Sequence, residues 1–207
     1  MKVRFLPALL IILGCAPVDA PAPRNVPDSA DTGARDAAIA AFATVQKVLQ
    51  HPRCQNCHIP GDAPLQFDAG IEHAMLVKRG PDGKGAPGLP CGSCHNDENP
   101  PASFGPHAPP GAPTWFLPPP DQKMVFINVP AAELCATVKN PRTNGGKDWD
   151  ALIHHVAEDE LVGWGWHPGG NRAPVPIPRA EFVAAFKTWA AAGGPCPGDD
   201  LTKMARR

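Results

Sequence analysis

The sequence contains the pattern Cys-x-x-Cys-His twice, as CQNCH at Cys54–His58 and as CGSCH at Cys91–His95. Two cysteines separated by two residues can bond to the two vinyl groups of one haem, and a histidine directly after them then lies below the iron as its proximal ligand. In a chain with only seven cysteines, two chance matches to this pattern are much less probable than one. The sequence therefore predicts two haem c groups, attached through Cys54, Cys57, Cys91 and Cys94, with His58 and His95 as proximal ligands.

Two other kinds of site use paired cysteines differently. A zinc site of the form CxxC…CxxC would gather all four thiolates around one ion. A thioredoxin-like redox pair would use one thiolate as a nucleophile, and it normally lies within a βαβ pattern, which is not visible here. Neither alternative accounts for a histidine at the same place after both pairs, which favours haem.

The sixth ligand of each iron decides the chemistry, because a second histidine lowers the reduction potential and a methionine raises it. An open sixth position would instead allow reaction with peroxide. We expect His73 and His155 to be the distal ligands, with Met124 as an alternative. A surface position for the histidines and simple burial for Met124 are the competing interpretations.

The chain begins with the charged segment MKVR, the apolar run at 5–13, then Gly14 and Cys15. This pattern predicts a signal peptide at residues 1–14, because the apolar run is too short to span a bilayer. The stretch ILGC resembles the lipobox of bacterial lipoproteins, which implies lipidation of Cys15. That resemblance also implies the periplasmic side of the outer membrane, since no acidic residue follows Cys15 directly. Ordinary cleavage, which would release a periplasmic protein without a lipid, is the alternative.

Export also affects how the remaining cysteines are counted, because free thiols outside the cytoplasm tend to be oxidised. Lipidation uses Cys15 and the two haem motifs use four more, which leaves Cys135 and Cys196. An even remainder of two favours a disulfide between them, although the sequence alone does not fix the pairing.

The composition predicts a mainly α protein with long loops. Proline (28) and glycine (20) are well above average usage, yet 43% of the residues are hydrophobic. Apolar periodicity predicts helices at 36–50, 130–139, 147–160 and 178–192. We expect a flexible tether at 15–34, one c-type cytochrome-like domain at 35–197 with its loops packed around two haems, and a polar tail at 198–207. The net charge of −1 and the lack of a basic patch argue against a nucleic-acid partner.

Several longer stretches resemble a known family. HPRCQNCHIPGDAP, GPDGKGAPGLPCGSCH, LIHHVAEDELVGWGWHPGG and AAGGPCP are similar to small exported dihaem c-type proteins of bacteria, often labelled isoquinoline 1-oxidoreductase subunit. The resemblance covers about residues 44–197. It implies a cysteine pair at the positions of Cys135 and Cys196, and a protein that accepts electrons from an exported dehydrogenase.

Two functions follow from these observations. The first is a dihaem cytochrome that passes electrons between an exported dehydrogenase and the respiratory chain, held at the membrane by its lipid. The second is a dihaem enzyme of peroxidase type with one open iron, for which His154, His155 and Glu158 are candidate pocket residues.

Overall fold

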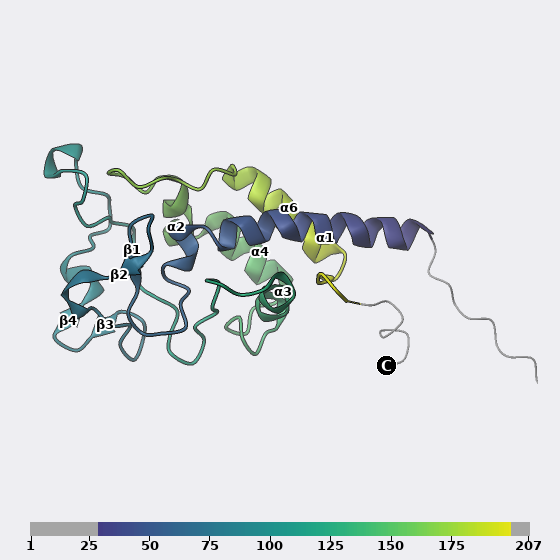
Figure 1. The fold of residues 1–207 in the computed structure, drawn as a ribbon, viewed down its shortest axis with the longest axis horizontal. Coiled ribbons are helices and arrows are strands. Elements are labelled where there is room, and N and C mark those ends of the chain that lie inside the picture. Colours follow the sequence, from purple (N-terminus) through teal and green to yellow (C-terminus); the bar gives the residue numbers. More distant parts are fainter. Residues whose placement is uncertain (1–28, 200–207) are drawn as a thin grey trace, which may run out of the picture.

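The computed structural model describes residues 29–199, which form a mainly α protein (Figure 1). The predicted signal peptide and Cys15 lie outside these residues. No helix in the described part is both long enough and apolar enough to cross a membrane.

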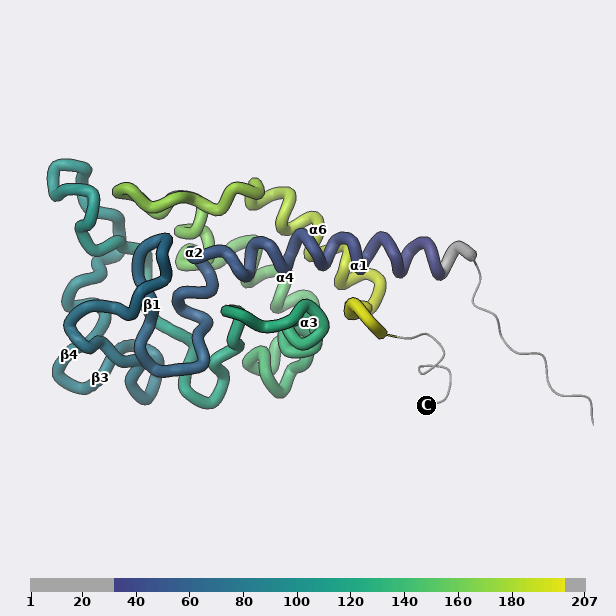
Figure 2. Tube along the Cα trace, in the orientation of Figure 1, coloured from purple at the N-terminus to yellow at the C-terminus, as the bar shows by residue number. Residues whose placement is uncertain are grey.

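The longest element is α1, Ser29–Leu49, which packs along α6, Arg179–Ala191 (Figures 1 and 2). The predicted start of this helix at residue 36 was wrong, and so was the predicted end of the tether at residue 34. The stretch from Asp28 to His51 contains no proline, and it is rich in alanine, the best helix former. No proline therefore ends the helix before residue 36, and the single Gly33 is tolerated within it.

Two shorter helices complete the helical end of the molecule. They are α3, Ala131–Lys139, and α4, Trp149–Glu158, and their predicted spans agree with the structure to within two residues. The prediction of one continuous helix to residue 160 was wrong, because Asp159 is extended and its side chain caps a separate short helix, α5, Glu160–Gly163.

The hydrophobic core lies between these helices. Three large apolar side chains of α6 are buried, with Phe182, Phe186 and Trp189 at 1% exposure or less. Phe42 of α1 packs on Trp189 with ring centroids 4.8 Å apart. Side chains of α3 and α4 join the same cluster, so four helices from both ends of the chain share one core.

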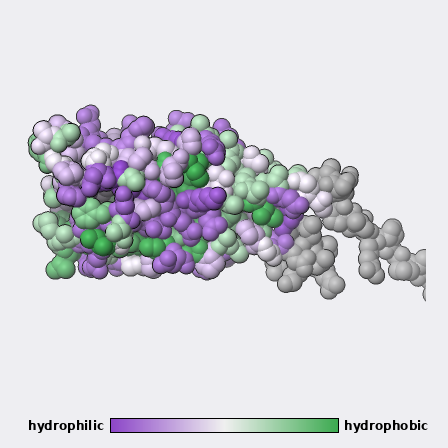
Figure 3. Space-filling model, turned by 45° about the horizontal axis from the view of Figure 1, so that its top comes forward, coloured by the Kyte–Doolittle hydropathy of each residue, from purple (hydrophilic) through white to green (hydrophobic). Residues whose placement is uncertain are grey.

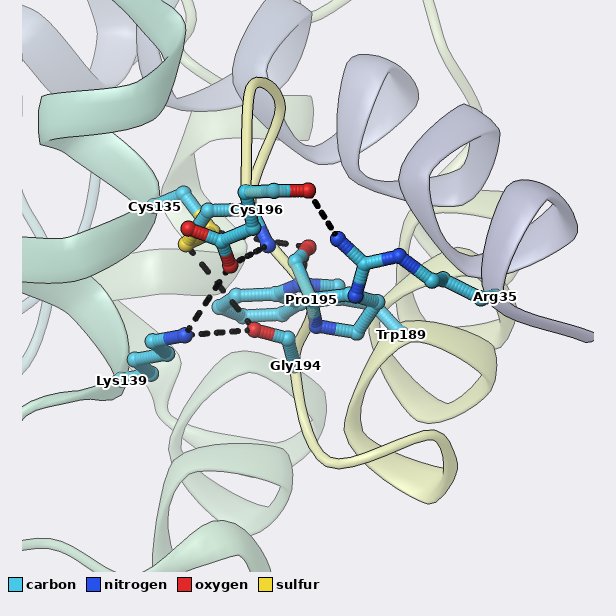
Figure 4. Close-up of a disulfide and its surroundings, with 8 residues drawn as sticks. Arg35, Cys135, Lys139, Trp189, Gly194, Pro195 and Cys196 are labelled. Atoms are coloured by element: carbon cyan, nitrogen blue, oxygen red, sulfur yellow. Dashed lines mark hydrogen bonds and ion pairs between the residues drawn. A yellow bond between two sulfur atoms is a disulfide. The ribbon is translucent and has the colours of Figure 1, made fainter. Parts of the chain in front are cut away.

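A disulfide joins Cys135 of α3 to Cys196, which follows α6, as the cysteine count favoured (Figure 4). Around it, Lys139 donates to the carbonyl of Gly194 at 2.9 Å, and the indole of Trp189 donates to the carbonyl of Pro195 at 3.1 Å. The C-terminal part of the described chain is therefore tied to the core both covalently and by hydrogen bonds.

The opposite end of the molecule consists of loops with little regular structure (Figures 1 and 2). It contains one short helix, α2, Pro52–Gln55, and two hairpins. In the hairpins, β1 (Leu65–Gln66) pairs with β2 (Ile71–Glu72), and β3 (Gly85–Ala86) pairs with β4 (Leu89–Pro90). Short 3-10 turns lie at Ala74–Leu76, Cys91–Ser93, Ala102–Phe104 and Trp164–Trp166. On the face seen in Figure 3, hydrophobic residues form several separate clusters among hydrophilic ones.

The buried guanidinium of Arg79 holds these loops together. Its side chain is fully buried and donates to the carbonyls of Ile59, Gly61 and Pro118, and Asp62 lies 3.5 Å from its Nε. One cation thereby fixes two loops that border the first Cys-x-x-Cys-His motif.

Candidate functional site

The two Cys-x-x-Cys-His motifs adopt the same local turn. In the first, the backbone N–H groups of Cys57 and His58 both donate to the carbonyl of Cys54, at 3.2 and 3.3 Å. In the second, Cys94 and His95 donate in the same way to Cys91, at 3.1 and 3.0 Å. The two motifs therefore match in conformation as well as in sequence.

Different elements hold the two motifs in place. The first begins in α2, where Pro52 occupies the first turn and the Nδ1 atom of His51 accepts a hydrogen bond from Arg53 N. The second follows the β3–β4 hairpin, in which Gly85 has a φ of 104°. A Cβ at Gly85 would lie 2.8 Å from the backbone nitrogen of Cys91, so only glycine fits against the second motif here.

Both motif histidines use Nδ1 to bind a backbone carbonyl. His58 Nδ1 lies 2.9 Å from the carbonyl oxygen of Met124, and His95 Nδ1 lies 2.7 Å from that of Pro110. Because a carbonyl can only accept, Nδ1 carries the proton in both rings and Nε2 keeps its lone pair. This is the arrangement that second-sphere partners impose on metal-ligating histidines.

Each of these imidazoles is also stacked on an aromatic ring. The ring of His58 lies 3.8 Å from that of Phe126 at an angle of 12°, and the ring of His95 lies 4.4 Å from that of Trp115 at 6°. Desolvation lowers the pKa of His58 to about 4 and also lowers that of His95. Both rings are therefore neutral near pH 7 and fixed in orientation, as a ligand to iron must be.

Each motif opens onto its own pocket. The first pocket has a volume of about 370 Å³ and includes Cys54, Cys57, His58 and His155 in its lining. The second has a volume of about 190 Å³ and includes Cys91, Cys94, His95 and His73. Most of the other lining residues are apolar, so both pockets suit a ligand with a hydrophobic body.

Each pocket contains one of the two predicted distal histidines. His155 lies in the first pocket with His58, and its Nδ1 atom is 3.3 Å from Oδ2 of Asp159. His73 lies in the second pocket, where its ring centroid is 6.1 Å from that of His95, although it follows the first motif in sequence. The second pocket also contains Met75 and His107.

The alternative distal ligand Met124 also lines the first pocket, together with His58 and His155. Its backbone carbonyl binds His58, and its side chain packs against the helical core. The structure therefore keeps both candidates, His155 and Met124, in the first pocket, and Met124 also packs against the core as the competing interpretation expected.

Of the pocket residues named for a peroxidase, only His155 lines a pocket. His154 and Glu158 are exposed and border neither. Asp159, which the sequence reasoning missed, lines the first pocket beside His155, and the hydrogen bond from His155 lowers the pKa of this carboxyl.

The four motif cysteines are unpaired thiols in the structure. Desolvation raises the pKa of Cys54 to about 12 and that of Cys57 to about 11, whereas a redox-active pair needs a lowered thiol pKa. Within residues 29–199, no group of three or more His, Cys, Asp or Glu side chains is arranged to hold a metal ion. The raised pKa values of Cys54 and Cys57 argue against a thioredoxin-like redox pair at the first motif.

The two pockets share a wall, which sequence reasoning did not foresee. Arg53, Cys57, Trp115 and Trp164 line both pockets. The rings of Trp115 and Trp164 meet edge to face at 4.9 Å, and the guanidinium of Arg53 lies over Trp164 at 5.7 Å. The two sites are therefore immediate neighbours.

Asn99, from the loop after the second motif, fixes this wall. Its Oδ1 accepts hydrogen bonds from the indole N–H of Trp164 and from Gly111 N, and its Nδ2 donates to the carbonyl of His167. An asparagine in a polar loop gave no signal for this role, because its partners lie far away in the sequence.

Comparison with known proteins did not identify a relative. No family model matches this chain, and no match was found among curated proteins or solved structures. The functional argument therefore depends on the residues and their geometry.

Proposed function

We propose that this protein is a dihaem c-type cytochrome that carries electrons between an exported dehydrogenase and the respiratory chain. The observation that carries the proposal is the matched state of His58 and His95. Each follows a Cys-x-x-Cys pair, donates Nδ1–H to a backbone carbonyl, stacks on an aromatic ring and lines a mostly apolar pocket. A thiol redox site would require none of these features, and a single zinc site shared by all four cysteines would not require the same surroundings around both histidines.

The residues that would hold the two groups follow from this geometry. Cys54 and Cys57 would attach one haem and Cys91 and Cys94 the other, and Nε2 of the following histidine would bind the iron. Each iron would then accept and release single electrons, and the protein would set the spacing and the reduction potentials. The shared wall supports the role of a carrier, because it keeps the two redox groups close together.

The distal ligands complete the proposal. His155 lies in the first pocket with Asp159 beside its Nδ1 atom, the arrangement in which a carboxylate orients a metal-binding histidine. His73 lines the second pocket, where its ring centroid is 6.1 Å from that of His95, and would bind the second iron. Two histidine ligands on each iron would give low reduction potentials and no open position for a substrate.

The same pair, His155 and Asp159, supports the second candidate function. A histidine with a carboxylate partner, lining the pocket without binding the iron, could serve as the acid–base group of a dihaem peroxidase. The spin state separates the two functions, because two bis-histidine irons are low-spin, whereas a peroxidase keeps one five-coordinate, high-spin iron.

The first experiment is the intact mass of the protein after maturation in a host with haem c attachment machinery. We expect the mass of two haems, one haem in the Cys54→Ala/Cys57→Ala variant and one in the Cys91→Ala/Cys94→Ala variant. A chain without added haem would refute the proposal. Electron paramagnetic resonance of the two-haem protein then tests the ligands, and a high-spin signal would favour the peroxidase.

Export and membrane anchoring belong to the same proposal. Haem c is attached on the outer side of the cytoplasmic membrane, which agrees with the predicted signal peptide at residues 1–14. A lipid on Cys15 would hold the protein at the periplasmic face of the outer membrane. Replacement of Cys15 by alanine should then release the protein from the membrane fraction.

A further inference from the structure

Two guanidinium groups line the second pocket. Arg53 directly precedes Cys54 in α2, and its side chain is only 3% exposed, although it also lines the first pocket. Arg172 comes from the loop before α6. Neither thioether attachment through two cysteines nor iron ligation by a histidine requires two cations in a pocket whose other walls are mostly apolar.

The charge of Arg53 is only partly compensated. Its Nη2 atom forms an ion pair with Asp68, whose side chain is 47% exposed, and Asp68 also accepts a hydrogen bond from the backbone nitrogen of Ala173. The Nε atom of Arg53 is buried and has no hydrogen-bond partner. A buried donor without an acceptor is destabilising, so this nitrogen is suited to an acceptor that a ligand brings.

Arg172 is likewise not paired with a carboxylate. It donates to the carbonyls of Pro168, Gly169 and Ala108, and no Asp or Glu side chain within residues 29–199 lies within 4 Å of its guanidinium. The described lining of the second pocket also contains no Asp or Glu. The pocket thus offers two positive charges and an apolar interior, which matches a ligand with a flat apolar body and carboxylate groups.

We propose that Arg53 and Arg172 bind the carboxylates of the haem attached at Cys91 and Cys94, and that the buried charge of Arg53 raises the reduction potential of this haem. This inference rests on the proposed function and extends it to residues outside both motifs. A nearby cation stabilises the reduced iron, which carries one positive charge less than the oxidised iron. Asp68 opposes this effect, because its negative charge compensates Arg53.

These opposite effects give the test its sign. Removal of Arg53 should lower the reduction potential of the second haem, whereas Asp68→Asn, which leaves Arg53 uncompensated, should raise it. A loss of packing alone would not reverse the direction between the two variants. We expect at least a tenfold change in the reduction equilibrium for Arg53→Met, which corresponds to 59 mV for a one-electron couple.

The experiment is a spectroelectrochemical titration of the two-haem protein and of four variants, Arg53→Met, Arg53→Lys, Asp68→Asn and Arg172→Met. The control is Lys187→Met, which removes an exposed cation on α6. Intact mass reports the haem content of each variant, and the variant without Cys54 and Cys57 assigns the potential of the second haem. We expect Arg53→Met and Arg172→Met to lower this potential. Arg53→Lys keeps a positive charge, so it should lower the potential much less than Arg53→Met, and Lys187→Met should leave it unchanged.

The outcomes separate this inference from the proposed function. The inference alone would be overturned if both arginine variants carry two haems and the reduction equilibrium of the second haem stays within a factor of two of the wild-type value. The same holds if Asp68→Asn lowers the potential, since the effect would then be structural. A wild-type chain without haem at Cys91 and Cys94 would overturn both. If Arg53→Met does not fold, Arg172→Met and Asp68→Asn decide the matter.

Discussion

The Cys135–Cys196 disulfide offers a prediction whose size follows from the structure. It joins residues 61 apart in the sequence, and both cysteines are almost fully buried, at 0% and 3% exposure. In the chain-entropy treatment, a cross-link that closes a loop of roughly 60 residues stabilises the fold by about 4 kcal/mol. Since domains have a free energy of unfolding of about 5–15 kcal/mol, this one bond contributes a large share.

The perturbation is the double variant Cys135→Ala/Cys196→Ala, and the assay is urea unfolding followed by circular dichroism at equal haem content. We expect a loss of about 4 kcal/mol and a larger dependence of the free energy of unfolding on urea, because the unlinked denatured chain is more expanded. The matched control is Lys139→Met, which removes the hydrogen bond to the carbonyl of Gly194 and the 4.0 Å ion pair with Asp199, and should cost about 1 kcal/mol. A double variant within 1 kcal/mol of the wild type, with an unchanged urea dependence, would refute the reasoning.

Three further predictions concern single side chains. In urea unfolding, Gly83→Ala should destabilise the protein by at least about 2 kcal/mol more than the control Gly88→Ala. Both glycines have a positive φ, but only at Gly83 would the new Cβ clash, because it would lie 1.9 Å from the carbonyl oxygen of Leu117. Asn99→Ala should cost about 2–3 kcal/mol by the same assay, because three hydrogen bonds are lost, whereas Asn96→Ala, at an exposed position, should cost less than about 0.5 kcal/mol. Asp159→Asn keeps a cap for α5 but removes the carboxylate beside His155, so it should raise the reduction potential of the first haem; an unchanged potential in a redox titration would show that His155 is not its ligand.

The helical half of the molecule could be predicted from the sequence, because its signals are local. Apolar residues at helical spacing gave the spans of α3, α4 and α6 to within two residues, and Phe182 and Trp189 of α6 are buried in the core. The errors have local causes too. Ser29 begins α1 early because nothing breaks the helix there, and the side chain of Asp159 starts a new helix where the apolar pattern continues.

The candidate site could be predicted only in part. The two motifs predicted six residues for haem attachment, which stays a prediction, and the structure places His155 in the first pocket and His73 in the second. The shared wall was not predictable, because Trp115, Trp164 and Asn99 come from loops without periodicity and meet across long stretches of sequence. Arg53 stands next to a motif cysteine, yet nothing in its sequence position says that its side chain faces both pockets.

The charges around the two pockets differ, and this difference predicts the direction of electron transfer. Arg53 lines both pockets. The other charged residues that line the first pocket are Lys147 and Asp159, whose charges cancel, whereas the only other charged residue in the described lining of the second pocket is Arg172. The second site is thus the more positive, and a cation stabilises the reduced state of iron. We therefore expect the haem at Cys91 and Cys94 to have the higher potential, so that an electron entering at the first motif moves to the second. Redox titration of the two single-haem variants measures this order directly, and a higher potential at the first motif would show that axial ligation, rather than pocket charge, dominates.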